Sequence, residues 1–280
     1  MLSPKKVLVT GVHGLIGNVV YRALAQAPDR FDPHGLARRR QPSERISPAS
    51  LFEVPDDRLH IANLTDWDAV SQAVAGMDVV VHMAADPSGR GGWESVRDNN
   101  IVGTYHVFEA SRLAGVKRVI SASSIQVVFG YRAEEPYRSI LGAHFENVDP
   151  AAIRPITHEQ PARPLNLYAC SKVWGEALAH MYSQTYGMSA ICLRIGWVVA
   201  EDRPPHAWAM SQWCSQRDIA QLVERCIEAP ESVRFDVFFG VSVNPYPLVD
   251  IEHARQVLGY EPLDHAQDYP VSGDSMETFR

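Results

Sequence analysis

Residues 7–17 of this chain read VLVTGVHGLIG, and this stretch decides the fold. The apolar run at 7–10 predicts a buried β-strand, and the residues after the turn show an apolar pattern at helical spacing. Gly11, Gly14 and Gly17 lie between strand and helix. Glycines at such a turn let the backbone approach a pyrophosphate, which the positive end of the helix dipole attracts. A plain strand-to-helix turn is the alternative explanation of the same glycines.

The alternation of short β-rich runs and helical patterns continues along the chain. We expect strands at residues 7–10, 34–37, 58–62, 78–83, 117–121, 190–195 and 234–239, and helices at residues 15–26, 67–74, 100–113, 167–186, 218–228 and 251–258. Strands that alternate with helices form βαβ units, which build a parallel sheet. We therefore predict an α/β fold, a doubly wound parallel sheet with helices on both faces.

Residues 131–164 depart from this alternation. They carry several prolines and many charges and show no clear period, so we expect a long irregular excursion. We interpret residues 1–280 as a single domain. Its dinucleotide-binding core would comprise residues 1–130 and 165–196, and its small, discontinuous substrate-binding part would comprise residues 131–164, 197–215 and 240–280.

Composition narrows the class of protein. The chain has 280 residues, of which 46% are hydrophobic and 21% charged, with a net charge of -7, as in ordinary globular proteins. Only Arg38, Arg39 and Arg40 form a basic block, and they suit a solvated turn or a cofactor contact better than nucleic acid. No apolar stretch is long enough to span a bilayer, and the first residues do not resemble a signal peptide. We expect neither a nucleic acid nor a membrane as partner.

The cysteines and histidines give no sign of a metal site. Cys170, Cys192, Cys214 and Cys226 form neither a CxxC pair nor a zinc-finger spacing. They suit core or free thiols in a reducing compartment, so we expect a cytoplasmic protein. The 11 histidines contain no HExxH pattern, and we predict no metal site.

Tyr168 and Lys172 carry the second chemical signal. Residues four apart share one face of a helix, so both polar tips can point into one cleft. A free phenol has a pKa of about 10, and a nearby ammonium would lower it toward the range useful for proton transfer. Ser124 follows the strand expected at 117–121, where its hydroxyl could hold a substrate oxygen beside the tyrosine. Taken singly, each of these residues also fits a solvated helix or ordinary turn chemistry.

Together these elements resemble the extended short-chain dehydrogenases, also called the NAD-dependent epimerase/dehydratase family. Further segments match that family, namely VHMAA at 81–85, NIVGT at 100–104, LRIG at 193–196 and LGYEP at 258–262. The resemblance covers nearly the whole chain. It implies a Rossmann fold and an NAD(P)-dependent oxidoreductase that passes hydride between the nicotinamide and a small alcohol or carbonyl substrate.

The resemblance also implies roles for single residues. Tyr168 would be the acid/base, Lys172 would bind the nicotinamide ribose and tune the tyrosine, and Ser124 would polarise the substrate oxygen. Asn100 would lie in the helix behind the site and help a proton relay. The cofactor would contact Gly11, His13, Gly14, Leu15, Ile16, Gly17, Arg38, Arg39, Asn63, Leu64, Met83, Ala84, Ala85, Asn100, Tyr168, Lys172 and Ile195. The substrate would contact Asp86, Ser88, Ser124, Gln126, Trp197 and Trp208.

Within the family, the motifs are most similar to those of uronate dehydrogenases. The active-site helix and the stretch from Arg194 to Asp218 carry this similarity. Two features differ. Those enzymes have an arginine before a tryptophan, which grips the sugar carboxylate, whereas this chain has Trp208 at about that place. They also have an Asn-His pair where this chain has Ile125 and Gln126. We therefore predict an aromatic or apolar pocket and poor activity on uronates.

The residues after the second strand predict the cofactor. NAD-binding versions of this fold carry an acid there, about 20 residues beyond the glycine turn, which bonds the ribose 2′-OH. Here Arg38 and Arg39 follow the strand, and no acid appears before Glu44. A guanidinium can grip a 2′-phosphate that a carboxylate would repel. We predict a preference for NADP(H), with Arg38 as the main contact and Arg39 as the secondary one; NAD is the alternative.

Three other functions fit parts of the sequence. A sugar epimerase with a tightly bound cofactor needs room for a large substrate, and the chain is short after the helix expected at 218–228. A non-catalytic dinucleotide sensor would not need Tyr168 and Lys172, and a scaffold would leave them unexplained. The family usually dimerises through two helices, here 100–113 and 167–186, so we expect a homodimer.

Overall fold

The central element of the protein is one parallel sheet. The computed structural model describes residues 3–87, 92–269 and 271. Within them, seven strands lie in the order β3-β2-β1-β4-β5-β6-β7, and every neighbouring pair is parallel. The strands are β1 (Lys5–Thr10), β2 (Phe31–Ala37), β3 (Leu59–Ile61), β4 (Val79–His82), β5 (Arg118–Ser124), β6 (Ser189–Ile195) and β7 (Phe235–Gly240). The predicted doubly wound α/β fold is confirmed.

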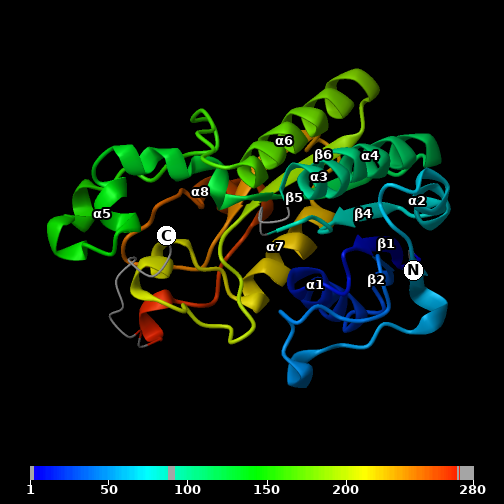
Figure 1. Cartoon of the computed structure of the whole chain (residues 1–280), viewed down its shortest axis with the longest axis horizontal. Helices are drawn as coiled ribbons and strands as arrows, with labels where there is room; N and C mark the ends of the chain where they lie inside the picture. Colours follow the sequence, from blue (N-terminus) through cyan, green and yellow to red (C-terminus); the bar gives the residue numbers. More distant parts are fainter. Residues whose placement is uncertain (1–2, 88–91, 270, 272–280) are drawn as a thin grey trace.

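Helices cover both faces of this sheet (Figure 1). They are α1 (Leu15–Ala25), α2 (Trp67–Val74), α3 (Gly92–Val96), α4 (Gly103–Ala114), α5 (Tyr137–Leu141), α6 (Leu167–Tyr186), α7 (Gln216–Glu228) and α8 (Glu252–Leu258), with a π-helical segment at Arg97–Val102. Long 3₁₀ segments span Ile125–Ala133 and Ala207–Gln212. None of the described helices combines the length and apolarity needed to cross a bilayer.

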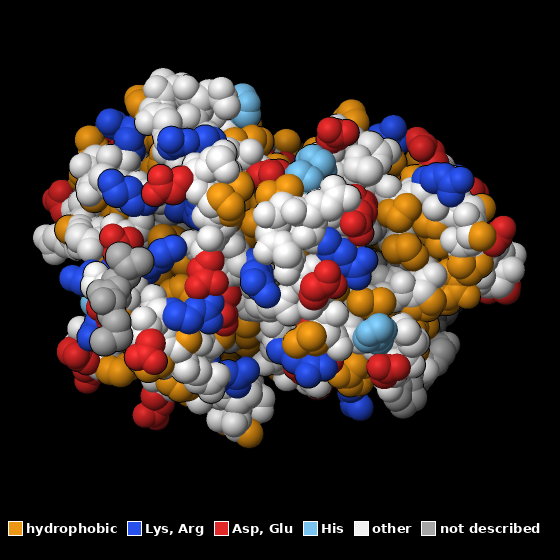
Figure 2. Space-filling model, turned by 180° about the vertical axis from the view of Figure 1, so that it is seen from behind, with side chains coloured by type: hydrophobic (Ala, Val, Ile, Leu, Met, Phe, Trp, Pro, Cys, Tyr) orange, Lys and Arg blue, Asp and Glu red, His pale blue; other side chains and the backbone are white. Residues whose placement is uncertain are grey.

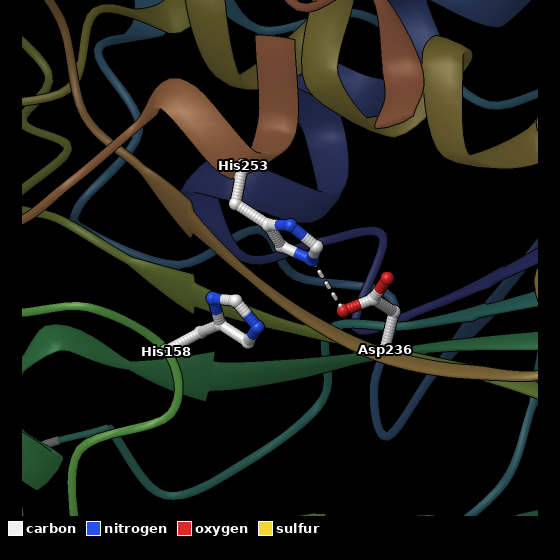
Figure 3. A group of neighbouring side chains, drawn as sticks. All are labelled: His158, Asp236 and His253. Atoms are coloured by element: carbon white, nitrogen blue, oxygen red, sulfur yellow. Dashed lines mark hydrogen bonds and ion pairs between the residues drawn. The ribbon is translucent and has the colours of Figure 1, made fainter. Parts of the chain in front are cut away.

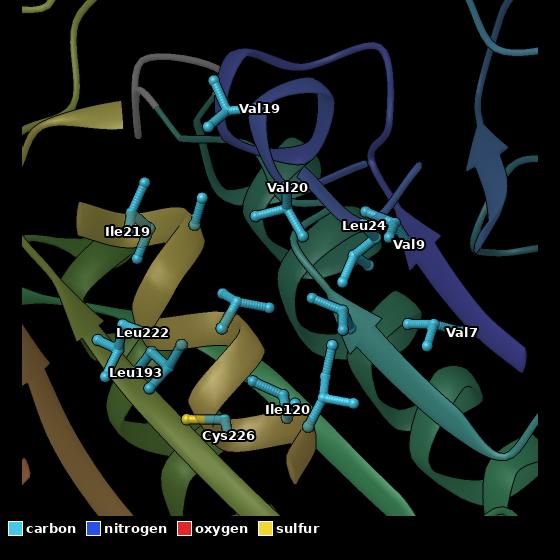
Figure 4. Packing of buried hydrophobic residues seen from close by; sticks show 14 of the residues in the cluster. Val7, Val9, Val19, Val20, Leu24, Ile120, Leu193, Ile219, Leu222 and Cys226 are labelled. Carbon is cyan, nitrogen blue, oxygen red and sulfur yellow. The ribbon is translucent and has the colours of Figure 1, made fainter. Parts of the chain in front are cut away.

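Alternation along the strands assigns each helix to a face. Val7 and Val9 of β1 pack in the cluster that contains buried residues of α1, α7 and α8, part of which Figure 4 shows. Leu8 between them points to the opposite cluster, which contains buried residues of α2, α4 and α6. Successive side chains of a strand point to opposite faces, so one apolar strand supports both helical layers.

The strand order places a crevice at the carboxyl ends of β1 and β4. From β1 the chain builds outward through β2 to β3, then crosses back to β4 and builds toward β7. In open α/β sheets, ligands bind where the strand order reverses in this way. The glycine turn follows β1, so it lies at this crevice.

The expectation for residues 131–164 is partly wrong. The segment contains short helical turns, including α5, rather than wholly irregular chain. Ten apolar side chains between Ile125 and Ile156 are buried in one cluster. The other buried members of this cluster are Phe239, Val241, Leu248 and Val249. Long-range contacts to the chain after β7 order it, and no pattern within the segment could reveal them.

Several element boundaries also differ from the expected ones, and β5 extends to Ser124, which therefore ends the strand rather than following it. Strand β2 begins at Phe31, three residues before the expected start. The helix expected at 100–113 is divided, because Asn100 lies in the π-helical segment and α4 begins at Gly103. π-Helical turns are rare and are found mostly at functional sites, and this one lies directly behind the crevice.

Charged side chains of both signs lie on the face opposite to the one seen in Figure 1. On the face seen in Figure 2, basic and acidic side chains lie interspersed. This distribution agrees with the net charge of -7 and differs from the clustered basic face typical of nucleic-acid-binding domains.

Candidate active site

The glycine turn brings the chain very close to its neighbours. Gly11 has a φ of +73°, and a Cβ there would lie 2.8 Å from the Cα atom of Ala84. A Cβ on Gly17 would lie 2.2 Å from the carbonyl oxygen of Gly11. Helix α1 begins here with Gly14 as its N-cap, without a side-chain cap and without an acid in its first turn. The N-terminal N–H groups of α1 are thus left for an anion, which fits the pyrophosphate of a dinucleotide.

A cleft of about 500 Å³ opens over this turn. Fourteen of the residues singled out from the sequence line it, namely Gly11, His13, Gly14, Leu15, Ile16, Gly17, Arg38, Arg39, Asn63, Leu64, Met83, Ala84, Ala85 and Asp86. The sequence patterns missed the other lining residues, which are Leu36, Ala37, Gln41, Ser43, Arg45, Ala62, Pro87, Ser95, Asn99 and Val198. Ser88 lies outside the described residues.

Tyr168 and Ser124 lie together at the start of α6. Asn166 caps this helix by accepting a hydrogen bond from the backbone N–H of Ala169 at 2.8 Å, and its side-chain amide donates to Gln126 at 3.0 Å. Burial raises the pKa of the Tyr168 phenol, while a hydrogen bond with Ser124 and the charge of Arg45 act in the opposite direction. The hydroxyl pair can therefore hold one oxygen and exchange a proton with it.

Lys172 does not lower the tyrosine pKa as the sequence had led us to expect. Its Nζ lies 5.6 Å from the centroid of the Tyr168 ring and donates a hydrogen bond to the carbonyl oxygen of Ala122 at 2.8 Å. Burial lowers the pKa of Lys172 to about 8. The expectation of a lowered pKa for Tyr168 is wrong here, because burial penalises the charged forms of both groups.

Asn100 is buried between the crevice and α6. Its carbonyl oxygen accepts a hydrogen bond from the backbone N–H of Asp86 at 2.7 Å, and its amide donates to the carbonyl oxygen of Asp86 at 3.2 Å. The amide also donates to the Ser171 hydroxyl at 3.0 Å. The Asn100 side chain thus ties the chain after β4 to α6. The residue that it binds on α6, Ser171, directly precedes Lys172.

His82 adds a buried polar chain under the same crevice. Its Nδ1 lies 2.8 Å from the Thr10 hydroxyl, and its Nε2 lies 3.1 Å from the Thr104 hydroxyl. The backbone N–H of Ala84 donates to the same Thr10 hydroxyl at 3.2 Å. Burial, together with a smaller effect of the Lys172 charge, lowers the pKa of His82 to about 3. The imidazole is therefore neutral and links β1, β4 and α4.

A buried ion pair fixes α6 against the sheet. Arg194 of β6 donates two hydrogen bonds of 2.9 Å to the carboxylate of Glu176, which also accepts one from the Ser123 hydroxyl at 2.6 Å. Glu176 lies one helical turn after Lys172, and Ser123 directly precedes Ser124. The ion pair thus sets the spacing between the strand that carries the serine and the helix that carries the tyrosine.

Aromatic rings gather beyond the end of β6. The rings of Trp197 and Trp208 lie 4.7 Å apart at 45°, and the ring of His206 stacks on Trp208 at 5.8 Å. Trp213 is fully buried and pairs with Trp197 in a parallel bridge. Ile195, the last residue of β6, is buried opposite Ser124 of β5. The expected substrate-side tryptophans thus form one cluster.

A second cluster of polar side chains, not foreseen in the sequence, lies away from the crevice. The donor atoms of His158, Asp236 and His253 all lie within 4.8 Å of one another, and His253 Nε2 lies 2.8 Å from Asp236 (Figure 3). The two imidazole rings stack at 3.8 Å with 12° between their planes. A metal ion must lie near the plane of each ring that binds it, so two parallel rings cannot converge on one ion. The arrangement fits a hydrogen-bonded histidine stack.

Comparisons with known proteins agree with this geometry. The model of the NAD dependent epimerase/dehydratase family matches residues 7–216. Over 273 residues the chain is 33% identical to an NAD-dependent glucose-6-phosphate dehydrogenase of Haloferax volcanii, covering 97% of this chain and 98% of that protein. It is 29% identical to an L-arabinose 1-dehydrogenase (NAD(P)(+)) of the same organism, covering 93% and 97%. A solved mutant of uronate dehydrogenase from Agrobacterium tumefaciens, complexed with NAD, superposes with a TM-score of 0.75 at 29% identity, covering 94% and 86%.

Proposed function

Because this chain belongs to the NAD-dependent epimerase/dehydratase family, we propose that it is an NAD(P)-dependent dehydrogenase or reductase of a small, sugar-like alcohol or carbonyl compound. The observation that carries the proposal is that Asn100 binds both Asp86, in the lining of the glycine-turn cleft, and Ser171, which lies between Tyr168 and Lys172 on α6. Relatives of similar identity are named for glucose 6-phosphate and L-arabinose, which supports a sugar substrate without choosing one.

In this proposal the chain's own residues handle the proton. Ser124 would hold the substrate oxygen by a hydrogen bond, and Tyr168 would exchange the proton with that oxygen. Lys172 would bind the ribose of the cofactor from the same helix face. The bound nicotinamide would supply or accept the hydride. The cofactor-binding residues would be those named from the sequence, and the tryptophans at 197 and 208 would face the substrate.

Replacing one hydroxyl tests the mechanism. Tyr168→Phe should abolish turnover while NAD(P)H binding, followed by fluorescence titration, largely survives. Tyr186→Phe removes a hydroxyl from an exposed tyrosine of the same helix and should leave activity unchanged. Turnover by Tyr168→Phe at the wild-type rate would overturn the assignment.

NAD(P)H consumption in the presence of a panel of carbonyl compounds separates a reductase from an epimerase. A reductase consumes NAD(P)H, whereas an epimerase converts its substrate without net consumption.

We propose that NADP(H) is the preferred cofactor. Strand β2 ends at Ala37, so Arg38 and Arg39 follow the strand directly, and both line the cleft. Arg38→Asp should weaken NADPH binding far more than NADH binding, because the added carboxylate repels the 2′-phosphate. Tighter binding of NADH than of NADPH by the wild-type protein would refute this preference.

We propose that uronates are poor substrates. The cluster of Trp197, His206 and Trp208 supplies aromatic faces, and the resemblance to uronate dehydrogenases implies a carboxylate-gripping arginine in those enzymes at about the place of Trp208. A sugar ring can stack on such faces. L-Arabinose, glucose 6-phosphate, glucuronate and galacturonate should be compared in one oxidation assay. Efficient and saturable oxidation of either uronate would contradict the proposal.

We propose that the protein is a cytoplasmic homodimer of one domain, divided into core and substrate parts as the sequence suggests. Large apolar side chains are exposed on both expected interface helices, namely Tyr105 and Leu113 on α4 and Leu167, Met181 and Tyr186 on α6. The four cysteines are free, which suits a reducing compartment. A monomeric mass in light scattering would refute the dimer.

A further inference from the structure

The loop after β2 is fastened to the glycine turn. The backbone N–H of Ser43 donates to the carbonyl oxygen of His13 at 2.8 Å, and His13 Nδ1 lies 2.8 Å from the carbonyl oxygen of Arg39. The backbone N–H of Arg45 in turn donates to the Ser43 hydroxyl at 3.2 Å, and Ile46 is buried. Arg45 is therefore held beside the turn although it is far from it in sequence.

Arg45 also belongs to the lining of the dinucleotide cleft. Its side chain lines the same cleft as Gly11 to Gly17. Its charge acts on the phenol of Tyr168, where it favours the ionised form against the effect of burial. Arg45 therefore combines a place in the lining of the cleft over the glycine turn with a charge that reaches the active-site phenol.

The cleft carries surplus positive charge on this side. Arg38, Arg39 and Arg45 all line it, and none of the three forms an ion pair with a carboxylate among the described residues. Arg40, from the same loop, behaves differently, because it points away and pairs with Asp56 at 2.5 Å. Guanidinium groups without a carboxylate partner at a cleft favour a bound anion.

We propose that Arg45 binds the pyrophosphate of the dinucleotide, opposite the N-terminus of α1. The proposal rests on the dinucleotide-binding function proposed above and adds a residue to it. A guanidinium can donate two parallel hydrogen bonds to phosphate oxygens, while the helix N-terminus offers its N–H groups from the other side. Arg45 would then serve NAD(H) and NADP(H) alike, whereas Arg38 would act only on the 2′-phosphate.

Ligands that contain different phosphates test this division. NADH and NADPH carry the pyrophosphate, and adenosine 2′-monophosphate carries the 2′-phosphate without it. Arg45→Gln should weaken the binding of NADH and of NADPH by a similar factor. The factor should be about tenfold to one hundredfold, as expected for loss of a charge-assisted contact. The variant should leave the affinity for adenosine 2′-monophosphate unchanged. Arg38→Gln should weaken the binding of NADPH and of adenosine 2′-monophosphate but not the binding of NADH.

Arg40→Gln is the matched control, because Arg40 lies on the same loop and outside the cleft lining. It should bind all three ligands as the wild type does, and equal melting temperatures would show that the variants are folded. If Arg45→Gln lost affinity for NADPH but not for NADH, Arg45 would be assigned to the 2′-phosphate and the proposal would be overturned. Unchanged dinucleotide affinity with a raised KM for an anionic substrate would overturn it in favour of substrate binding. A wild-type protein that binds no dinucleotide would instead overturn the proposed function.

Discussion

Removing the carboxylate of Glu176 should be among the most damaging single changes to this protein. The carboxylate accepts two hydrogen bonds from Arg194 and one from Ser123, and Arg194 is only 4% exposed. In Glu176→Leu the guanidinium stays buried without its counter-ion. Breaking a buried pair in this way costs about 3–5 kcal/mol. For a chain of this size, that lowers the melting temperature by roughly 10 °C.

A double-mutant cycle shows whether the buried charge is the cause. Urea unfolding, followed by tryptophan fluorescence, should be measured for the wild type, Glu176→Leu, Arg194→Met and the double variant. The double variant leaves no buried charge, so it should be more stable than either single variant. Arg30→Met, which removes the surface ion pairs with Glu224 and Glu228, should change the free energy of unfolding by less than about 1 kcal/mol.

Two outcomes would refute this reasoning. Glu176→Leu could unfold at the urea concentration of the wild type, which would mean that the ion pair contributes nothing. The effects of the two single variants could instead add in the double variant, which would mean that Glu176 and Arg194 act independently rather than as a pair.

Two further predictions concern the glycine turn and the buried histidine. Gly17→Ala should weaken dinucleotide binding by more than about tenfold and lower the free energy of unfolding by about 1–3 kcal/mol, since the new methyl group would meet Gly11 at 2.2 Å. Gly175→Ala is the control, because a Cβ there has open space, and it should leave dinucleotide binding unchanged in the same titration. His82 has a pKa of about 3 in the folded protein and 6.5 as the reference, so below pH 6.5 the unfolded chain takes up a proton that the folded protein cannot hold. Stability should therefore fall by about 1.4 kcal/mol per pH unit between those values because of this residue. Parallel stability profiles of the wild type and His82→Gln would contradict that assignment.

Features that depend on neighbours in sequence could be predicted. The bounds of α2 and α6 follow from local apolar periodicity, and the glycine turn, Tyr168 and Lys172 are local patterns. Strand β2 was harder, because Pro33 and Gly35 interrupt its apolar run and hide its first residues. The strand nevertheless lies between β1 and β3, where pairing with both neighbours outweighs its weak propensity.

Features that depend on contacts between distant residues could not be predicted. Arg45 lies in a loop without a recognisable pattern, and the hydrogen bonds of its loop neighbours Arg39 and Ser43 to His13 hold that loop at the cleft. The spacing of Tyr168 and Lys172 predicts the wrong direction for the pKa of the Tyr168 phenol for a related reason. Spacing in a helix shows which charges are near, but it does not show how much water the folded chain excludes from the phenol.

The third apolar cluster has a consequence for how such proteins diversify. Its buried residues come from only two stretches, 125–156 and 239–249, and none of them belongs to the two clusters that flank the sheet. Substitutions there can be accommodated without repacking the layers that hold the glycine turn. Exchanging both stretches together between this chain and a relative named for another sugar should therefore transfer substrate preference more readily than exchanging either one alone.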